Sequence, residues 1–275
     1  GDRWTKDDDR WTKDDDRRAK DDDRWRKNDD GKQFGLKTPD ARRKTTEDGK
    51  QIADCRLSIV DLLKGLAGVE GLLRIRVSSL EPGDISEELL DVFCSHKNIM
   101  PHIHLSVQSG SSATLKRMCR QYDAEELREK IEMIKRRLDR PAITCDIIVG
   151  FPGETDDDFA ETVELSKWAG FSKIHVFPFS VRTGTPAAKM KNRLPANVIK
   201  QRAQTLRNLS DTLGHNFIEQ FLGQTCEVLI ENDKTTSGRC ERYFEVYVNL
   251  NGQRLEKNQI IKARITGNVE DGVIG

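Results

Sequence analysis

The sequence has 275 residues and a mass of 31.3 kDa, with 36% hydrophobic and 33% charged side chains. Its 46 basic and 46 acidic side chains cancel, which excludes binding of nucleic acid through overall charge and leaves only a local patch for it. No run approaches the 18 apolar residues of a membrane span and no apolar segment follows the N-terminus, so we expect a cytoplasmic protein without a membrane partner.

Residues 1–50 differ in composition from the rest of the chain. They contain 31 charged side chains and repeat a seven-residue unit, DRWTKDD, whose apolar position holds Trp4, Trp11 and Trp25 and, once, Arg18. A heptad needs two apolar positions to build a seam, and so polar a segment cannot offset the entropy of ordering. We predict a disordered, low-complexity tail over 1–50. Stacking of its tryptophans on bases is the alternative, although the Asp triplets would repel phosphate.

Residues 51–220 alternate between strand and helix patterns. Short β-branched runs predict strands at 74–78, 103–107, 143–149 and 173–179. Helix starts are indicated by Ser86, by Asp123 with Glu126 before 124–138, by Thr155 with Asp158 before 156–169, and by Pro195 before 196–221. Strands separated by such helices form βαβ units, so we predict an α/β fold with a parallel sheet.

From residue 221 to 275 the pattern changes to short strands separated by turns. The runs CEVLI, FEVYVN and IIKARITG are divided by turn-rich pieces that contain Asn, Asp and Gly. This spacing predicts a small antiparallel β domain.

The stretch from Asp146 to Thr155, DIIVGFPGET, predicts a buried strand, a turn with two glycines, and a helix. That order places backbone N–H groups and a helix N-terminus at the carboxyl edge of a parallel sheet, where ligands bind. A tight turn that needs glycine for its backbone angles explains the same residues equally well. Asp146 itself favours a functional role, because a carboxylate within an apolar run is costly unless it is paired or faces a ligand.

A second polar stretch, Ser106 to Ser111, follows the strand at 103–107. Regular alternation places Ser106 and Gln108 on one face of the chain, away from the apolar residues. That face suits either a polar ligand or solvent, and spacing alone does not choose between them.

Residues 182–207 contain seven basic residues and no acidic one: Arg182, Lys189, Lys191, Arg193, Lys200, Arg202 and Arg207. A charge run is usually a solvated face. This one directly precedes the β domain, so a phosphate-binding strip for RNA is the competing interpretation.

The six cysteines, at 55, 94, 119, 145, 226 and 240, are at least 14 residues apart. This spacing predicts no zinc site and no redox pair. Cys145 in a strand and Cys94 on a helix are expected as small core residues. His102 and His104 share a strand face, but no third metal ligand lies at a usable spacing.

Four segments together resemble the radical S-adenosylmethionine methylthiotransferases, most closely the bacterial branch that acts on threonylcarbamoyladenosine in tRNA. They are RIRVSSLEP (74–82), HIHLSVQSGSSATLKRMCRQY (102–122), DIIVGFPGETDDDF (146–159) and HVFPFSVRTGTPAAKM (175–190). Residues 221–275, from FLGQTCEVLIE onward, are similar to the TRAM domain of that family, an RNA-binding barrel.

The resemblance implies a partial radical S-adenosylmethionine (β/α) barrel over 51–220, with S-adenosylmethionine and a 4Fe–4S cluster as cofactors and tRNA as partner. Arg120 would meet the carboxylate of S-adenosylmethionine, and Asp146 would face the barrel interior. The other residues implied to line the site are Ser106, Gln108, Ser109, Gly150, Phe151 and Pro152.

The sequence departs from the family at the cluster. No CxxxCxxC motif occurs in the 275 residues, and in this family three thiolates converge on the cluster from one short loop. We therefore expect a catalytically incomplete chain. A non-catalytic RNA-binding fragment and a methylthiotransferase for a ribosomal protein are the alternatives.

Overall fold

The computed structural model describes residues 57–232, 236–248, 255–269 and 272–275. The predicted tail over 1–50 lies outside these residues, so its disorder remains a prediction.

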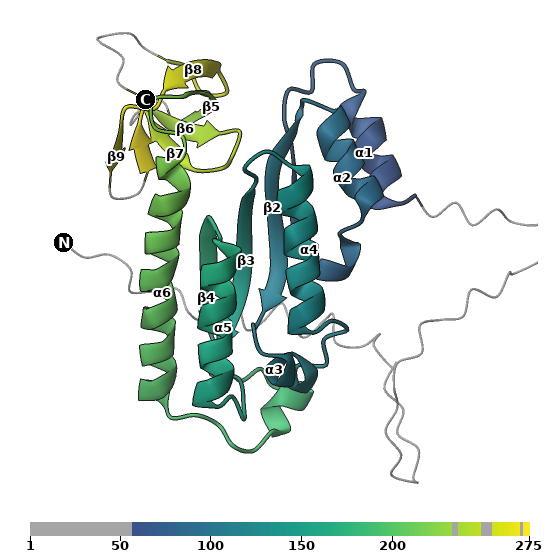
Figure 1. The fold of residues 1–275 in the computed structure, drawn as a ribbon, viewed down its shortest axis with the longest axis vertical. Helices are drawn as coiled ribbons and strands as arrows, with labels where there is room; N and C mark the ends of the chain where they lie inside the picture. The colour runs from purple at the N-terminus through teal and green to yellow at the C-terminus, as the bar shows by residue number, and fades with distance from the viewer. Residues whose placement is uncertain (1–56, 233–235, 249–254, 270–271) are drawn as a thin grey trace, which may run out of the picture. The chain divides into compact units, whose positions relative to one another are not determined.

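Four parallel strands form one sheet of the fold (Figure 1). They are β1 (Ile75–Leu80), β2 (Ile99–Gln108), β3 (Ala142–Val149) and β4 (Lys173–Pro178), paired in sequence order. The parallel sheet and its four strands are as predicted, because each β-branched run is short and is followed by a helix that returns the chain to the same edge.

Most connections are helical. The helices are α1 (Ile59–Ala67), η2 (Pro82–Asp84), α2 (Glu87–Ser95), α3 (Ser112–Arg117), α4 (Ala124–Arg137), α5 (Asp156–Ala169), η3 (Pro186–Lys189) and α6 (Ala196–Glu219). Ser86 caps α2, and capping boxes at Asp123 and Thr155 start α4 and α5, as predicted. Among the described residues, no helix is both long and apolar enough to cross a membrane.

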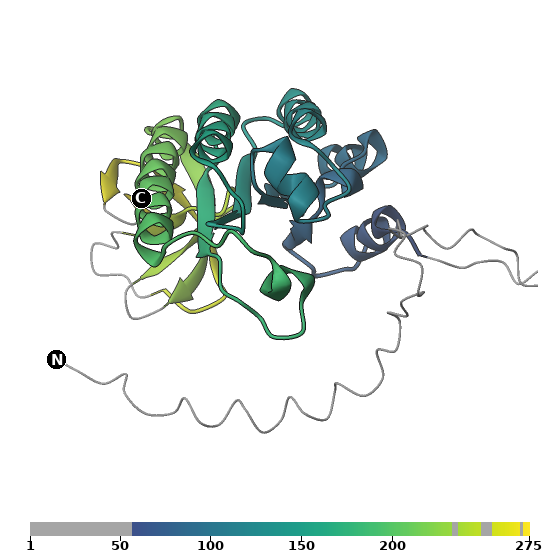
Figure 2. The ribbon, with the colours of Figure 1, turned by 90° about the horizontal axis from the view of Figure 1, so that it is seen from below.

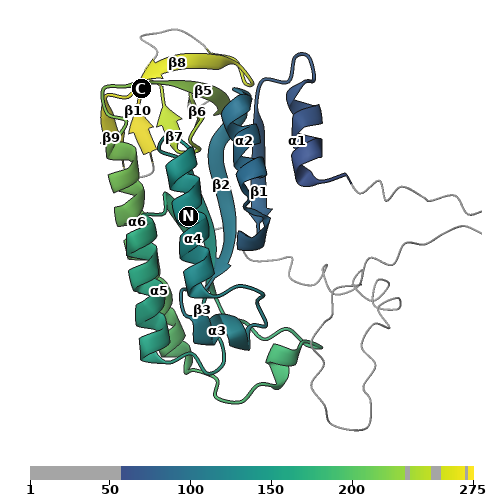
Figure 3. The same cartoon turned by 45° about the vertical axis from the view of Figure 1, so that its right-hand side comes forward.

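The two faces of the parallel sheet differ in chemistry. Helices α4, α5 and α6 cover one face (Figure 2), and there Leu105 of β2 and Ile147 of β3 are fully buried in the core that includes Ile131 of α4. The opposite face carries polar side chains, among them His104 and Asp146. Helix α1 packs next to α2 at the β1 end of the sheet (Figure 3).

The C-terminal residues form a second, six-stranded sheet. Its strands are β5 (Thr225–Asn232), β6 (Ser237–Cys240), β7 (Glu245–Tyr247), β8 (Ile260–Arg264), β9 (Gly267–Val269) and β10 (Gly272–Ile274), in the order β8-β5-β6-β7-β10-β9. Four of the five pairings are antiparallel, as predicted. The remaining pair, β7 and β10, is parallel.

We call the C-terminal part of the chain, residues 221–275, the β module. Arginines join it to the amino edge of the parallel sheet, which is the edge at which the strands begin. Arg74 donates to the carbonyl oxygens of Glu227 (2.7 Å) and Arg239 (2.9 Å), and Arg76 donates to those of Cys240 and Glu241. Aromatic packing continues the joint: Phe217 and Phe221, at the end of α6, pack with Phe244 of the module and with Ala142 of β3.

Candidate functional site

The turn after β3 lies at the carboxyl edge of the parallel sheet, as predicted. Gly150 has φ +78° and Gly153 has φ +80°, a region that favours glycine. A Cβ atom on Gly150 would lie 2.5 Å from Cγ1 of Ile199 in α6. Phe151 and Pro152 are buried. Backbone angles and close packing therefore account for Gly150 without a ligand.

A buried ion pair holds α6 against this turn. The Glu154 carboxylate accepts the N–H of Gly150 (3.1 Å) and pairs with Arg202, which also donates to Asp156 (2.6 Å). Arg202 is only 6% exposed, and burial raises the pKa of Glu154. The inclusion of Arg202 in a solvent-facing basic strip is therefore wrong, because its guanidinium is buried and pairs with the Glu154 carboxylate.

The end of β2 carries a bulge that the sequence did not predict. Leu105 pairs with Cys145, but Gln108 pairs with Ile147, and Gln108 has φ +62°. The bulge interrupts the alternation that was expected to place Ser106 and Gln108 on one face. Gln108 is buried, so it does not follow the predicted pattern.

Tyr122 stabilises this bulge. Its hydroxyl donates to the carbonyl oxygen of Ser106 (2.5 Å) and lies 3.3 Å from that of Val107, and burial raises the pKa of Tyr122 to about 12. The phenol therefore stays protonated, which a hydrogen-bond donor needs.

Ser109 and Gly110 pack against α5 rather than opening into a cavity. The Ser109 hydroxyl lies 3.2 Å from Thr162 Oγ1, and the N–H of Gly110 donates to the same oxygen (3.0 Å). A Cβ atom on Gly110 would lie 2.6 Å from the Cα of Thr162. This part of the predicted site holds β2 to α5.

Asp158 connects three segments at the same edge. It accepts hydrogen bonds from the Ser111 hydroxyl (2.5 Å), from Arg117 (2.6 Å) and from Thr155 of its own helix. Burial alone would raise the pKa of Asp158, but these donors lower it to about 2. The carboxylate therefore stays charged and fixed at neutral pH.

Arg120 forms an ion pair with Glu81, which follows β1, at 2.9 Å. Both side chains are partly exposed, so the guanidinium keeps donors free for another acceptor. The pair also brings the segment after α3 to the end of β1.

The polar face of the sheet contains a row of four side chains in contact: Asp146, His104, Thr144 and His102. Asp146 lies 3.2 Å from His104 Nε2, and Thr144 Oγ1 lies 2.8 Å from His104 Nδ1 and 3.0 Å from His102 Nε2. A hydroxyl donates only once. If neutral His104 donates to Asp146, Thr144 donates to His104 and accepts from His102, which leaves His102 Nδ1 without a proton.

That assignment agrees with two further observations on His102. Its Nδ1 is the buried ring nitrogen that has no partner in the described residues. Burial, followed by the positive charge of Arg76, lowers the pKa of His102 to about 3, so the ring is neutral. His102 also stacks on Tyr243 of the β module, with ring centroids 4.2 Å apart.

The structure thus brings the predicted residues together only in part. Ser106 and Asp146 occupy neighbouring strands, β2 and β3, while the ends of both strands carry the remaining predicted residues Gln108, Ser109, Gly150, Phe151 and Pro152. The sequence interpretation missed Tyr122, Glu154 and the bridging role of Thr144.

The basic residues Arg182, Lys189, Lys191 and Arg193 are all exposed. They lie around η3, which passes the carboxyl edge on the sheet face opposite α4, α5 and α6 (Figure 2). Their positive charge is therefore presented beside the candidate site.

Of the cysteines in the described residues, Cys226 and Cys240 contact each other across β5 and β6, and the other three lie apart. Cys145, Cys226 and Cys240 are buried, whereas Cys94 and Cys119 are exposed. The prediction of a core position is therefore correct for Cys145 and wrong for Cys94, which lies on the outer side of α2. Within the described ranges, no three His, Cys, Asp or Glu side chains gather as metal ligands, so these residues do not fit a 4Fe–4S cluster.

The sequence is similar to curated bacterial tRNA-modifying enzymes. It is 42% identical over 163 residues to the threonylcarbamoyladenosine tRNA methylthiotransferase of Bacillus subtilis, which covers 59% of this chain and 36% of that protein. It is 38% identical over 220 residues to the tRNA-2-methylthio-N(6)-dimethylallyladenosine synthase of Bacillus velezensis, which covers 79% of this chain and 43% of that protein. The chain thus spans less than half the length of these relatives.

Among solved structures, coproporphyrinogen III oxidase from Escherichia coli matches with a TM-score of 0.42 and 19% identity, over 50% of this chain and 32% of the oxidase. The Radical SAM superfamily profile matches residues 6–166, more than half of the chain, and begins within the segment predicted as a tail. The family indicated by the sequence motifs is confirmed, and the chain belongs to the radical S-adenosylmethionine superfamily.

Proposed function

We propose that this chain is part of a tRNA methylthiotransferase that acts on threonylcarbamoyladenosine. The observation that carries the proposal is the 42% identity over 163 residues with a relative named for that nucleoside. Dimethylallyladenosine is the competing substrate, because a relative named for it matches a longer part of the chain, 220 residues. Binding of anticodon stem-loops that carry one or the other nucleoside distinguishes the two, because the correct nucleoside should bind more tightly.

The carboxyl edge of the sheet supports binding of S-adenosylmethionine. That cofactor carries a carboxylate, an ammonium group and a ribose. Partly exposed Arg120 and Asp146 offer the opposite charges there, and Ser106 offers a hydroxyl on the neighbouring strand. The chemistry that this cofactor would supply at a reduced cluster is a radical for the nucleoside carbon. The residues of this chain orient it and hold Asp146 through His104.

Binding of S-adenosylmethionine by isothermal titration tests this site. The substitution Arg120→Gln removes the cation, and we expect about tenfold weaker binding. Arg136→Gln is the matched control, because Arg136 also pairs with a surface glutamate, Glu87, but lies on α4. Equal affinities for the two variants would contradict the assignment of Arg120.

We infer that these 275 residues do not assemble the 4Fe–4S cluster alone. Cysteine spacing supports this, since the smallest separation is 14 residues. The measurement is iron and sulfide content after anaerobic reconstitution, for which we expect no stoichiometric cluster. A full cluster whose electron paramagnetic resonance spectrum shifts with S-adenosylmethionine would contradict the inference.

The same cysteine spacing favours a second function, RNA binding without catalysis. The exposed cations Arg182, Lys189, Lys191 and Arg193 support it, because phosphate contacts account for most non-specific affinity for nucleic acid. Both functions share tRNA as partner. Retention of tRNA binding by a chain that binds no S-adenosylmethionine would favour the second.

A further inference from the structure

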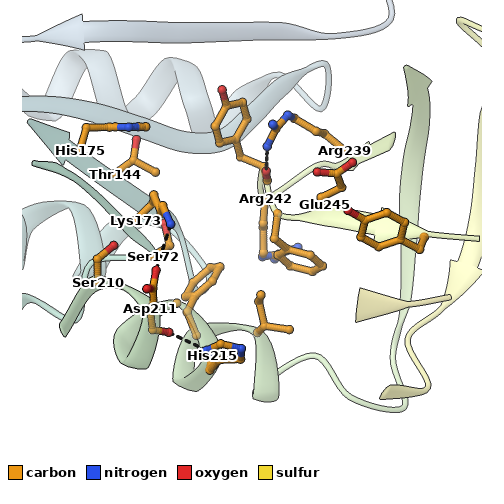
Figure 4. Close-up of a pocket in the computed structure, with 16 residues that line it drawn as sticks. Thr144, Ser172, Lys173, His175, Ser210, Asp211, His215, Arg239, Arg242 and Glu245 are labelled. Carbon is orange, nitrogen blue, oxygen red and sulfur yellow. Dashed lines mark hydrogen bonds and ion pairs between the residues drawn. The ribbon is translucent and has the colours of Figure 1, made fainter. Parts of the chain in front are cut away.

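A cavity of about 550 Å³ lies between the parallel sheet and the β module. Figure 4 shows Lys173, Asp211 and His215 on one side and Arg239, Arg242 and Glu245 on the other. The first three belong to β4 and α6, and the others to β6, β7 and the turn between them. The volume falls within the range of small-ligand sites.

The lining of this cavity combines positive charge with aromatic rings. Lys173, Arg239 and Arg242 face two carboxylates, and the rings of Tyr243 and Phe244 lie among them. The remaining polar and aromatic lining residues are Thr144, Ser172, His175, Ser210, Phe217 and Tyr247. Cations beside aromatic rings are the usual combination for a phosphate attached to a nucleobase.

Two of the cations keep donors available. Lys173 is 53% exposed, and its ammonium group has three donors, of which one contacts Asp211 (3.2 Å). Arg239 donates to the carbonyl oxygen of Tyr243 (3.0 Å) and stacks on the same ring, 4.5 Å from its centroid. Arg242, by contrast, is held by the backbone of Asp139 and Arg140, so it supports the wall.

The cavity is separate from the candidate S-adenosylmethionine site. Three of its lining residues lie toward the amino edge of the sheet. Thr144 is the third residue of β3, Ser172 is in the turn before β4, and Lys173 is the first residue of β4. The predicted cofactor residues Gln108, Ser109 and Gly150 to Pro152 lie at the carboxyl ends of β2 and β3, whereas Asp146 lies within β3 and contacts Thr144 of the cavity lining through His104. A parallel sheet places its reacting groups at the carboxyl edge, so the amino-edge cavity serves binding rather than catalysis.

We propose that this cavity binds one nucleotide, with its phosphate at Lys173 and its base toward the aromatic lining that the β module provides. This proposal rests on the proposed function, because the nucleotide would belong to the same RNA partner. The cavity would then contact that RNA at a second place, away from the modified nucleoside. A nucleotide within an RNA strand and a free nucleotide share this chemistry, and the experiment separates them.

The experiment measures binding of two probes to the whole chain without S-adenosylmethionine: a 17-nucleotide anticodon stem-loop and adenosine monophosphate. The variant is Lys173→Glu. Lys167→Glu is the matched control, because Lys167 is 54% exposed and pairs with Glu164 on α5, outside the cavity lining. Circular dichroism and thermal unfolding verify that both variants fold.

We expect Lys173→Glu to weaken stem-loop binding about tenfold and to lower its salt dependence by one phosphate contact, while Lys167→Glu changes neither. Weaker binding of both probes supports a strand nucleotide in the cavity. Weaker binding of adenosine monophosphate alone supports a free nucleotide there. Equal effects of the two variants, or none on either probe, would overturn the proposal.

These outcomes are independent of the proposed function. If Lys173→Glu has no effect, but Arg120→Gln still weakens binding of S-adenosylmethionine, then the cavity proposal fails and the proposed function stands. If instead Lys173→Glu weakens binding of a probe and Arg120→Gln leaves the binding of S-adenosylmethionine unchanged, then the cavity binds a nucleotide in a chain with another function.

Discussion

The two edges of the parallel sheet are stabilised in different ways. At the carboxyl edge, charged side chains interact mainly with other side chains. The Arg202 guanidinium pairs with Glu154, and the Asp158 carboxylate accepts hydrogen bonds from Ser111 and Arg117. At the amino edge, Arg74 and Arg76 donate directly to main-chain oxygens of the β module, and a cavity lies at the same edge. The difference indicates that the carboxyl edge is preorganised, as a site for chemistry requires, whereas the amino edge joins two modules and keeps space for a ligand.

The largest effect is expected from breaking the buried pair at the carboxyl edge. Arg202→Met leaves the Glu154 carboxylate buried without its partner, so we expect a loss of about 3–5 kcal/mol in the free energy of unfolding. Urea denaturation measures it, with exposed Arg207→Met on the same helix as control. The double variant Glu154→Met, Arg202→Met should recover most of the loss. A double variant as unstable as the single one would show that charge is not the cause.

The next effect concerns glycine at the same edge. Gly150→Ala combines a left-handed backbone with a contact to Ile199, and we expect a loss of about 2–4 kcal/mol. Gly170→Ala is the matched control, because Gly170 has φ +58° but no atom within 4 Å of its Cβ position. It should cost about 1–2 kcal/mol. Equal losses in the two variants would mean that α6 moves aside freely.

At the amino edge, we expect acid to destabilise the fold through protonation of His102. Its pKa is about 3 in the fold and 6.5 in the unfolded chain, so the unfolded chain takes up this proton first as pH falls. The free energy of unfolding should therefore fall below pH 6.5 by up to about 1.4 kcal/mol per pH unit, with no effect above it.

Urea denaturation at several pH values measures this slope. The variant His102→Gln should flatten it between pH 6.5 and 5, whereas His96→Gln, at a half-exposed position before β2, should keep it. An unchanged slope in the first variant would assign the acid sensitivity to other groups.

The smallest effect is expected in RNA binding at the carboxyl edge. Replacing Lys189, Lys191 and Arg193 with Gln should weaken tRNA binding about tenfold and reduce the slope of log affinity against log salt by about 2. Replacement of three exposed lysines elsewhere, Lys64, Lys97 and Lys116, is the control. Identical salt slopes for the two triple variants would exclude the strip as the RNA contact.

Local features of the fold could be predicted from the sequence. The four strands and the caps at Ser86, Asp123 and Thr155 depend on neighbouring residues, so a linear pattern is sufficient to find them. The bulge before Gln108 breaks the period of two that the prediction assumed. A run of seven basic residues did not reveal that Arg202 would be buried, because its partner, Glu154, is 48 positions away.

The candidate site follows the same rule. Residues within one motif, such as Gly150 to Pro152, could be placed at the carboxyl edge from their order alone. The His102–Thr144–His104 chain depends on the register between β2 and β3, which no single segment encodes. The amino-edge cavity requires β4, α6 and the β6–β7 turn to meet, so it emerges only in three dimensions.

The acceptors at the amino-edge joint have a consequence for how the protein can vary. Arg74 and Arg76 bind main-chain oxygens of the β module, and every amino acid provides such an oxygen. Positions 227, 239, 240 and 241 can therefore change identity without loss of docking, whereas the two arginines cannot. The main-chain part of this joint therefore tolerates changes of sequence in the β module, whereas the aromatic contacts of Tyr243 and Phe244 require their own side chains.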